Sequence, residues 1–133
     1  MDAFQQKMGH MFSTSDIDKI LLNGEFELLY QKLFKSGITQ KSTREDIEKS
    51  NKQIRKILDM IREIKNVDEK KKSSTLIKVL VFLEYQSKRR VIKEELKNCY
   101  KMFLERALEL GKNNPMVFDN LYDAIESITV ALL

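Results

Sequence analysis

Glycine and proline are scarce in this chain: its 133 residues include four Gly and one Pro, and no Trp. Because these two residues form most tight turns, the chain can contain few loops and has to be built from long helices. Its 42% of apolar residues suffice for the core of a single globular domain. The sequence therefore predicts an all-α fold, a single compact bundle of five to six helices.

Helix boundaries follow from the spacing of apolar residues and from the residues that cap or end helices. Ser and Asp in cap positions open STSDIDKILLNG, and Asn23-Gly24 ends it. Apolar residues continue at helical spacing from Phe26 to Gly37, a natural stop. The predicted helices span residues 13–23, 26–37, about 44–65 (capped by Ser42 or Thr43), 75–87, 92–111 and 115–132.

In one stretch the spacing of apolar residues does not distinguish a helix from a strand. TLIKVLVFLEYQS (75–87) is apolar nearly all round and rich in β-branched residues, which suits a buried helix or a buried strand. Since no other segment offers a strand to pair with, we interpret it as the central buried helix. The polar residues 66–74 before it are predicted to be a connection with a mobile Lys70–Lys72 run.

Cysteine usage and hydropathy indicate a cytoplasmic protein. Cys99 is the only cysteine, which excludes an internal disulfide and fits a reducing compartment. The longest nearly apolar run, residues 76–85, is too short to cross a bilayer, and no signal peptide is recognisable. Residues 1–12 are predicted to be a flexible N-terminal tail whose GHM is typical of an expression-tag remnant, and residues 13–133 one helical-bundle domain.

The chain offers few residues for catalysis. His10 is the only histidine, and Cys99 belongs to an apolar helical stripe where a packed thiol is expected. A structural zinc site needs about four Cys or His ligands. No Gly-rich phosphate loop or GxSxG turn occurs, and the carboxylates are spaced like ordinary helix-surface charges. We therefore expect no enzymatic activity, no metal and no cofactor.

Charge is segregated along the chain. The net charge of +4 combines +8 over residues 41–101 with acidic ends, −1 over residues 1–40 and −3 over residues 102–133. Such segregation suits a surface that meets a polyanion, but a solvated Lys-rich face has the same composition.

Two basic sets stand out in the middle of the chain, and both could contact phosphates without reading bases. Tyr85, near the second set, could stack on a base, although a place in the core is the better interpretation. The first set comprises Lys49, Lys52, Arg55, Lys56 and Arg62, and the second comprises Lys88, Arg89 and Arg90, followed by Lys93 and Lys97.

Three stretches, in this order and spacing, resemble the small helical subunit of type III-A (Csm) CRISPR interference complexes. The first is SNKQIRKILDMI (50–61), similar to a Ser/Thr-rich entry into a Gln-Ile-Arg helix. The second is LEYQSKRR (83–90), similar to a Leu-x-Tyr-x-x-x-Arg segment, and the third is VFDNLYDAIESITVAL (117–132), which resembles the closing helix. The chain departs from that pattern at Leu121, where an aromatic residue is usual, and at residues 126–128.

This resemblance implies a non-catalytic RNA-binding subunit. Such subunits stack in several copies along a ribonucleoprotein filament and hold the duplex of CRISPR RNA (crRNA) and target RNA through its phosphates. The implied partners are these RNAs, the other effector subunits and further copies of the chain, with no membrane. The predicted RNA-binding residues are Lys52, Arg55, Lys56, Arg62, Lys88, Arg89 and Arg90, of which Arg55 and Arg89 match motif arginines.

Two other interpretations stay open. The small subunit of the related type III-B (Cmr) complex is a second candidate with a similar role. A helical protein–protein interaction module with no RNA role is the alternative from a different functional class, and in it the cations would be a solvated face.

Overall fold

The computed structural model describes residues 12–35 and 44–132, which contain six α-helices and no strand. The predicted all-α bundle is confirmed. The helices are α2 (Thr14–Asn23), α3 (Phe26–Tyr30), α4 (Arg44–Ile64), α5 (Glu69–Lys88), α6 (Glu94–Leu110) and α7 (Met116–Leu132), with one π-helical turn, η1 (Gln31–Lys35), after α3.

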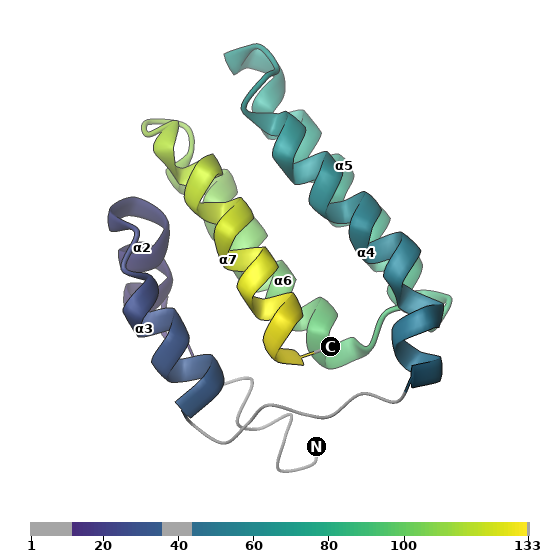
Figure 1. Cartoon of the computed structure of the whole chain (residues 1–133). Coiled ribbons are helices and arrows are strands. Elements are labelled where there is room, and N and C mark those ends of the chain that lie inside the picture. Colours follow the sequence, from purple (N-terminus) through teal and green to yellow (C-terminus); the bar gives the residue numbers. More distant parts are fainter. Residues whose placement is uncertain (1–11, 36–43, 133) are drawn as a thin grey trace.

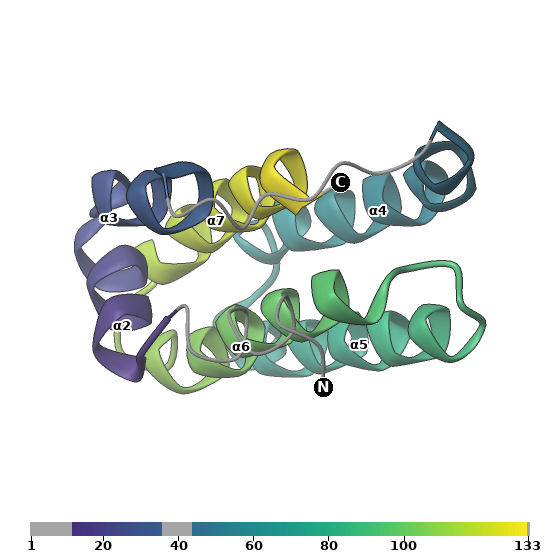
Figure 2. The same ribbon diagram turned by 90° about the horizontal axis from the view of Figure 1, so that it is seen from below.

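The four longest helices form an up-down-up-down bundle (Figure 1). Each packs against its neighbour in sequence, α4 on α5, α5 on α6 and α6 on α7, and α7 closes the bundle against α4. The shorter α2 and α3 pack on α7, and α2 also contacts α6, on the side away from α4 and α5 (Figures 1 and 2). Short connections between antiparallel neighbours therefore account for the order of α4 to α7, but not for the docking of α2 and α3.

Capping residues determine where α2 begins and ends. The Ser13 side chain accepts a hydrogen bond from the Asp16 backbone, and the Asp16 carboxylate accepts one from the Ser13 backbone, which forms a capping box. This pairing lowers the pKa of Asp16, chiefly through the backbone hydrogen bond from Ser13. At the other end Gly24 adopts a left-handed conformation with φ of 66°, which L-residues with a side chain rarely adopt.

Polar contacts fasten α2 to the bundle. The Arg106 guanidinium on α6 donates two hydrogen bonds to Asp18, at 2.6 Å to Oδ1 and 3.0 Å to Oδ2. Asn120 on α7 donates to the Leu21 carbonyl at 2.8 Å. Just before α2, Phe12 is buried with its ring edge-on to Phe103, 5.1 Å between centroids. Phe12, the last residue of the predicted flexible tail, therefore belongs to the core, and residues 1–11 lie outside the described part of the chain.

The core follows the apolar stripes that the sequence predicts on α4, α6 and α7. Ile54, Ile57, Ile61 and Ile64 of α4 are buried, as are Leu96, Cys99, Phe103 and Leu104 of α6 and Leu121, Ile125 and Ile128 of α7. Tyr100 is buried as well and shares a hydrogen bond with Thr129 of α7. Burial on this scale stabilises the fold by roughly 1.5–3 kcal/mol for each large aliphatic side chain.

The prediction of a central buried helix over residues 75–87 is wrong in position, although the segment is helical. Helix α5 packs on α4 and α6 and leaves its third side open, with Ile77, Val81 and Tyr85 exposed. In a four-helix bundle each helix has an outer side, so a stretch that is apolar all round cannot bury all of its residues. Tyr85, expected in the core, lies on the surface.

The predicted mobile connection over residues 66–74 is largely helical. Helix α5 begins at Glu69, so residues 65–68 alone join α4 to α5. Lys72 is buried, and its ammonium donates to the Lys65 carbonyl at 3.3 Å and lies 5.3 Å from the centre of the Phe118 ring. The predicted helix over residues 26–37 instead divides into α3 and η1, and Gly37, Ser42 and Thr43 lie outside the described residues.

Candidate nucleic-acid interface

The candidate site lies at the end of the bundle where α4 begins and α5 ends. Because α4 and α5 are antiparallel, the first turns of α4 meet the turn between α5 and α6. Between them is a hollow of about 290 Å³. It is lined by Lys49 and Ser50 of α4, Ser87 and Lys88 of α5, residues 90–93 of the turn, and Glu94 of α6.

The turn after α5 is built around Arg90. The Val91 amide donates to the Gln86 carbonyl at 3.0 Å and the Arg90 amide donates to the Ser87 carbonyl at 2.9 Å, the pair of bonds of a Schellman motif. Arg90 occupies the position of that motif where glycine is usual, and its φ is 60°. It is the one residue other than glycine with a positive φ in the described part of the chain. The backbone thus places an exposed arginine at a strained position beside the hollow.

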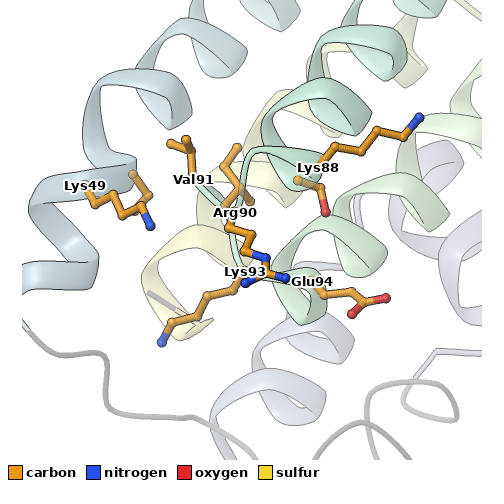
Figure 3. Close-up of a pocket in the computed structure, with 9 residues that line it drawn as sticks. Lys49, Lys88, Arg90, Val91, Lys93 and Glu94 are labelled. Carbon is orange, nitrogen blue, oxygen red and sulfur yellow. The ribbon is translucent and has the colours of Figure 1, made fainter.

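Cations dominate the lining of the hollow. Figure 3 shows Lys49 extending from α4 toward the turn, Arg90 and Lys93 extending from the turn, and Lys88 pointing away. Lys49, Lys88 and Arg90 are exposed and form no ion pair with any described residue. Glu94, at the start of α6, is the one acidic residue of the lining. The lining therefore has more cationic than acidic side chains.

A basic strip continues from the hollow along α4. At about 100° per residue, Lys49, Lys52 and Lys56 lie within roughly 60° of one another around the helix. All three are exposed, and the Lys56 ammonium lies 4.9 Å from the centre of the Phe82 ring of α5. The strip thus follows the side of α4 that is next to α5 and leads to the turn.

Two predicted residues lie outside this strip, one at its edge and one far from it. Arg55 is exposed, and the same helical geometry places it about 60° around α4 from Lys52 and about 120° from Lys49. Arg62 is about 20 Å further along the helix than Lys49, at 1.5 Å per residue. Its guanidinium donates a hydrogen bond to the Tyr122 hydroxyl, which raises the pKa of Arg62. The Arg62 guanidinium therefore lies at the other end of the bundle, where it contacts α7.

The second predicted set stays together at the turn. Lys88 is the last residue of α5, and Arg89 and Arg90 follow it in the turn. The Arg89 guanidinium lies 5.4 Å from the centre of the exposed Tyr85 ring, one helical turn earlier. The Lys97 ammonium, by contrast, lies 3.7 Å from the Glu84 carboxylate, and the Lys101 ammonium lies 3.3 Å from the same carboxylate. Acidic partners therefore compensate Lys97 and Lys101 of α6, whereas Arg89 and Arg90 of the turn form no ion pair with any described residue.

The side chains that line the hollow are mainly cationic and hydroxyl groups, with one carboxylate. Ser50, Ser87 and Glu94 are its only hydroxyl and carboxyl side chains. Elsewhere, burial raises the pKa of the Cys99 thiol to about 12, so that thiol is neither exposed nor ionised at neutral pH. The described residues hold no group of three or more His, Cys, Asp and Glu side chains that could share a metal ion, and His10 lies outside them. What the arrangement offers is electrostatic binding of an anion.

No helix within the described ranges is both long enough and apolar enough to span a bilayer.

Lys49 and Lys93 complete the lining but are not among the seven residues predicted to bind RNA. Lys49 belongs to the first basic set, and the signal that could have selected it is the short connection between α4 and α5. A four-residue link, residues 65–68, forces an antiparallel pair, and counting back from it aligns Lys49 with Glu84, one helical turn before Lys88.

Comparisons with known proteins give no relative for this chain: no family model matches its sequence, and no curated protein and no solved structure matches it. A proposal for its function therefore rests on the chemistry of its own residues.

Proposed function

We propose that this chain is a non-catalytic small subunit of a type III-A CRISPR effector complex that holds the crRNA–target RNA duplex through its phosphates. The observation that carries this proposal is the hollow between α4 and the α5–α6 turn, lined by the exposed cations Lys49, Lys88 and Arg90 and continued by the basic strip of α4. The sequence resemblance in residues 50–61 and 83–90 supports it, because these two stretches form the two sides of that surface.

The geometry suits contact with an RNA backbone rather than with bases. Lysine and arginine neutralise phosphates and release counterions without reading sequence. A row of cations along a rigid helix matches a row of phosphates, and double-stranded RNA is recognised mostly by shape and backbone. Arg89 and Arg90, at the turn, supply planar guanidinium groups that can bind a phosphate with two hydrogen bonds.

Binding by one copy is expected to be weak. Lys49, Lys52, Lys56 and the turn residues can reach few phosphates, so affinity in the complex would come from several copies in a row and from the other subunits. Arg55, matched by motif and at the edge of the basic strip, is then available for a neighbouring RNA strand or subunit. The type III-B small subunit would use the same surface in a similar role.

A second candidate function rests on a different observation. The exposed residues Ile77, Val81 and Tyr85 of α5 form an apolar surface of the kind that binds proteins. A helical interaction module with no RNA role would use that surface and leave the cations solvated.

A pair of matched double variants separates these functions. Lys49→Gln with Arg90→Gln removes two charges at the hollow, and Arg62→Gln with Lys65→Gln removes one lysine and one arginine at the other end of α4. The measurement is the crRNA that co-purifies with tagged protein from the native cell, identified by sequencing. We expect the first variant to lose most of the RNA and the second to retain it.

Single variants sharpen this test. Glu94→Gln removes the one acid of the lining and should increase RNA retention, which a general loss of folding cannot imitate. If wild-type protein purifies with an unrelated protein and without RNA, the CRISPR proposal fails and the interaction module gains support. Equal loss from both double variants would show that net charge matters and the hollow does not.

A further inference from the structure

An unpartnered apolar stripe runs along the outer side of α5. Ile77, Val81 and Tyr85 follow one another at intervals of four residues, which places them in one line on a helix. Their exposed fractions are 47%, 64% and 56%. Together with Leu80 they line a shallow hollow of about 410 Å³. Three large apolar side chains in line are more than scattered surface exposure and mark an interaction site.

The charges around this stripe point to its partner. The hollow is bordered by two acids, Glu84 and Glu105, and by two cations, Lys88 and Lys101, and Lys101 pairs with both acids within the same copy. A border with equal numbers of both signs has no net attraction for a polyanion, unlike the neighbouring basic hollow. It is complementary to a surface that also carries both signs around an apolar centre, and the same surface on another copy of the chain meets that description.

We propose that the α5 stripe is the site where a second copy of this chain binds, through an antiparallel pairing of the two α5 helices. The spacing of the stripe suits a two-fold axis at Val81, its middle residue. Val81 then meets Val81 of the second copy, and Ile77 lies beside Tyr85 of the second copy, so that the large ring fills the space next to the smaller side chain. Such a contact buries the exposed apolar area of both copies at once.

This pairing does not depend on the proposed RNA function, but it affects it. Lys88 borders both the stripe and the basic hollow, and it lies about 10 Å along α5 from Val81 at 1.5 Å per residue. A two-fold pair therefore carries two basic hollows at opposite ends of one contact, and it binds a long anion at two points. A row of copies in a filament needs an additional surface, because a two-fold contact closes on itself.

Matched valine substitutions test the surface. Val81→Glu places a charge in the stripe, and Val130→Glu places the same charge at an exposed valine of α7, so neither should unfold the protein. The measurement is the mass of the full chain by sedimentation equilibrium over a range of concentrations. We expect wild type and Val130→Glu to change from one copy to two as concentration rises, and Val81→Glu to stay a monomer. A wild type that is monomeric throughout, or a dimer that Val81→Glu leaves intact, overturns the proposal.

Cross-linking tests the two-fold axis itself. Val81→Cys places two thiols opposite each other within disulfide range, whereas Val130→Cys does not. The native Cys99 is buried and does not compete. Under mild oxidation we expect a covalent dimer from Val81→Cys at a rate well above that of Val130→Cys. Equal rates would exclude the antiparallel arrangement, whatever the effect on RNA binding.

Discussion

Two residues of this protein occupy positions that are unfavourable for their side chains, and each position leads to a prediction that can be measured. Arg90 stands where the end of a helix favours glycine, and Cys99 is an ionisable thiol in the core. The sequence predicts one of these two environments and not the other. The stripe of α6 predicts the burial of Cys99, whereas nothing in KRRV distinguishes Arg90 from Arg89, because a left-handed φ depends on how the chain turns back toward α6.

Arg90→Gly should stabilise the fold while weakening RNA binding. A side chain at a left-handed φ costs about 1 kcal/mol relative to glycine. Relief of that strain should raise the melting temperature by roughly 3–5 °C in a chain of this size. Arg90→Ala is the control, because it removes the charge and keeps the strain. Calorimetry of the three proteins provides the measurement, and a lower melting temperature for Arg90→Gly than for Arg90→Ala would contradict the assignment.

Stability should fall as the pH rises above 9. Burial raises the pKa of Cys99 from an ordinary value of 9.0 to about 12, and burial also raises the pKa of Tyr100. A group whose folded pKa is raised stabilises the fold fully below its unfolded pKa, and this contribution is lost as pH rises toward the folded value. For the thiol the loss is on the order of 1 kcal/mol per pH unit between those two values. Cys99→Ala should flatten this part of the curve in urea titrations from pH 8 to 11, and an unchanged slope would contradict it.

At the scale of the elements, periodicity and capping residues predict the helices well, but not their surroundings. The boundaries of α2, α4, α6 and α7 agree with the sequence within a few residues, because local capping and local apolar spacing determine them. The position of α5 could not be predicted in the same way. Its apolar residues occur all round the helix, so the sequence does not show which side faces α4 and α6 and which side is left open.

The end of α6 illustrates how one residue links two elements. Gly111 has φ of −68°, an ordinary value, so backbone freedom does not explain the glycine. A Cβ there would lie 2.4 Å from the Phe118 ring of α7 and 2.8 Å from the Ala107 carbonyl. Gly111→Ala should therefore cost about 1–3 kcal/mol through overpacking between α6 and α7. Chemical denaturation measures the loss, with Lys112→Ala as the exposed neighbour that should change little.

For the molecule as a whole, the candidate site exists because two basic segments that are distant in sequence meet at one end of the bundle. The sequence predicts both segments and places Lys88, Arg89 and Arg90 correctly at the end of α5 or in the turn after it. It does not predict that Lys49 joins them or that Arg62 is held by Tyr122, since both facts depend on which helix faces which. The sequence does not show which helices pack against each other. The four-residue link between α4 and α5 shows only that these two helices are antiparallel neighbours.

RNA binding by the isolated protein should depend on salt in a way that locates the contacts. Each phosphate contact that is lost should reduce the slope of log K against log salt concentration by about 1. We expect that reduction for Lys49→Gln and no change for Arg62→Gln, measured by fluorescence anisotropy with an RNA duplex of arbitrary sequence. Affinity that depends on sequence, or slopes that are the same for both variants, would argue against backbone contacts at the hollow.

The up-down-up-down order of α4 to α7 also has a consequence for folding kinetics. The contacts of α4 with α5, α5 with α6 and α6 with α7 join helices that follow each other in the chain. The closure of α7 on α4, the docking of α2 on α6 and α7, and the docking of α3 and η1 on α7 bring distant segments together. Chains with mainly local contacts fold in microseconds to milliseconds. The helices that carry the basic hollow are consecutive, so their hairpins can form early, before α7 closes the bundle and α2 docks on it.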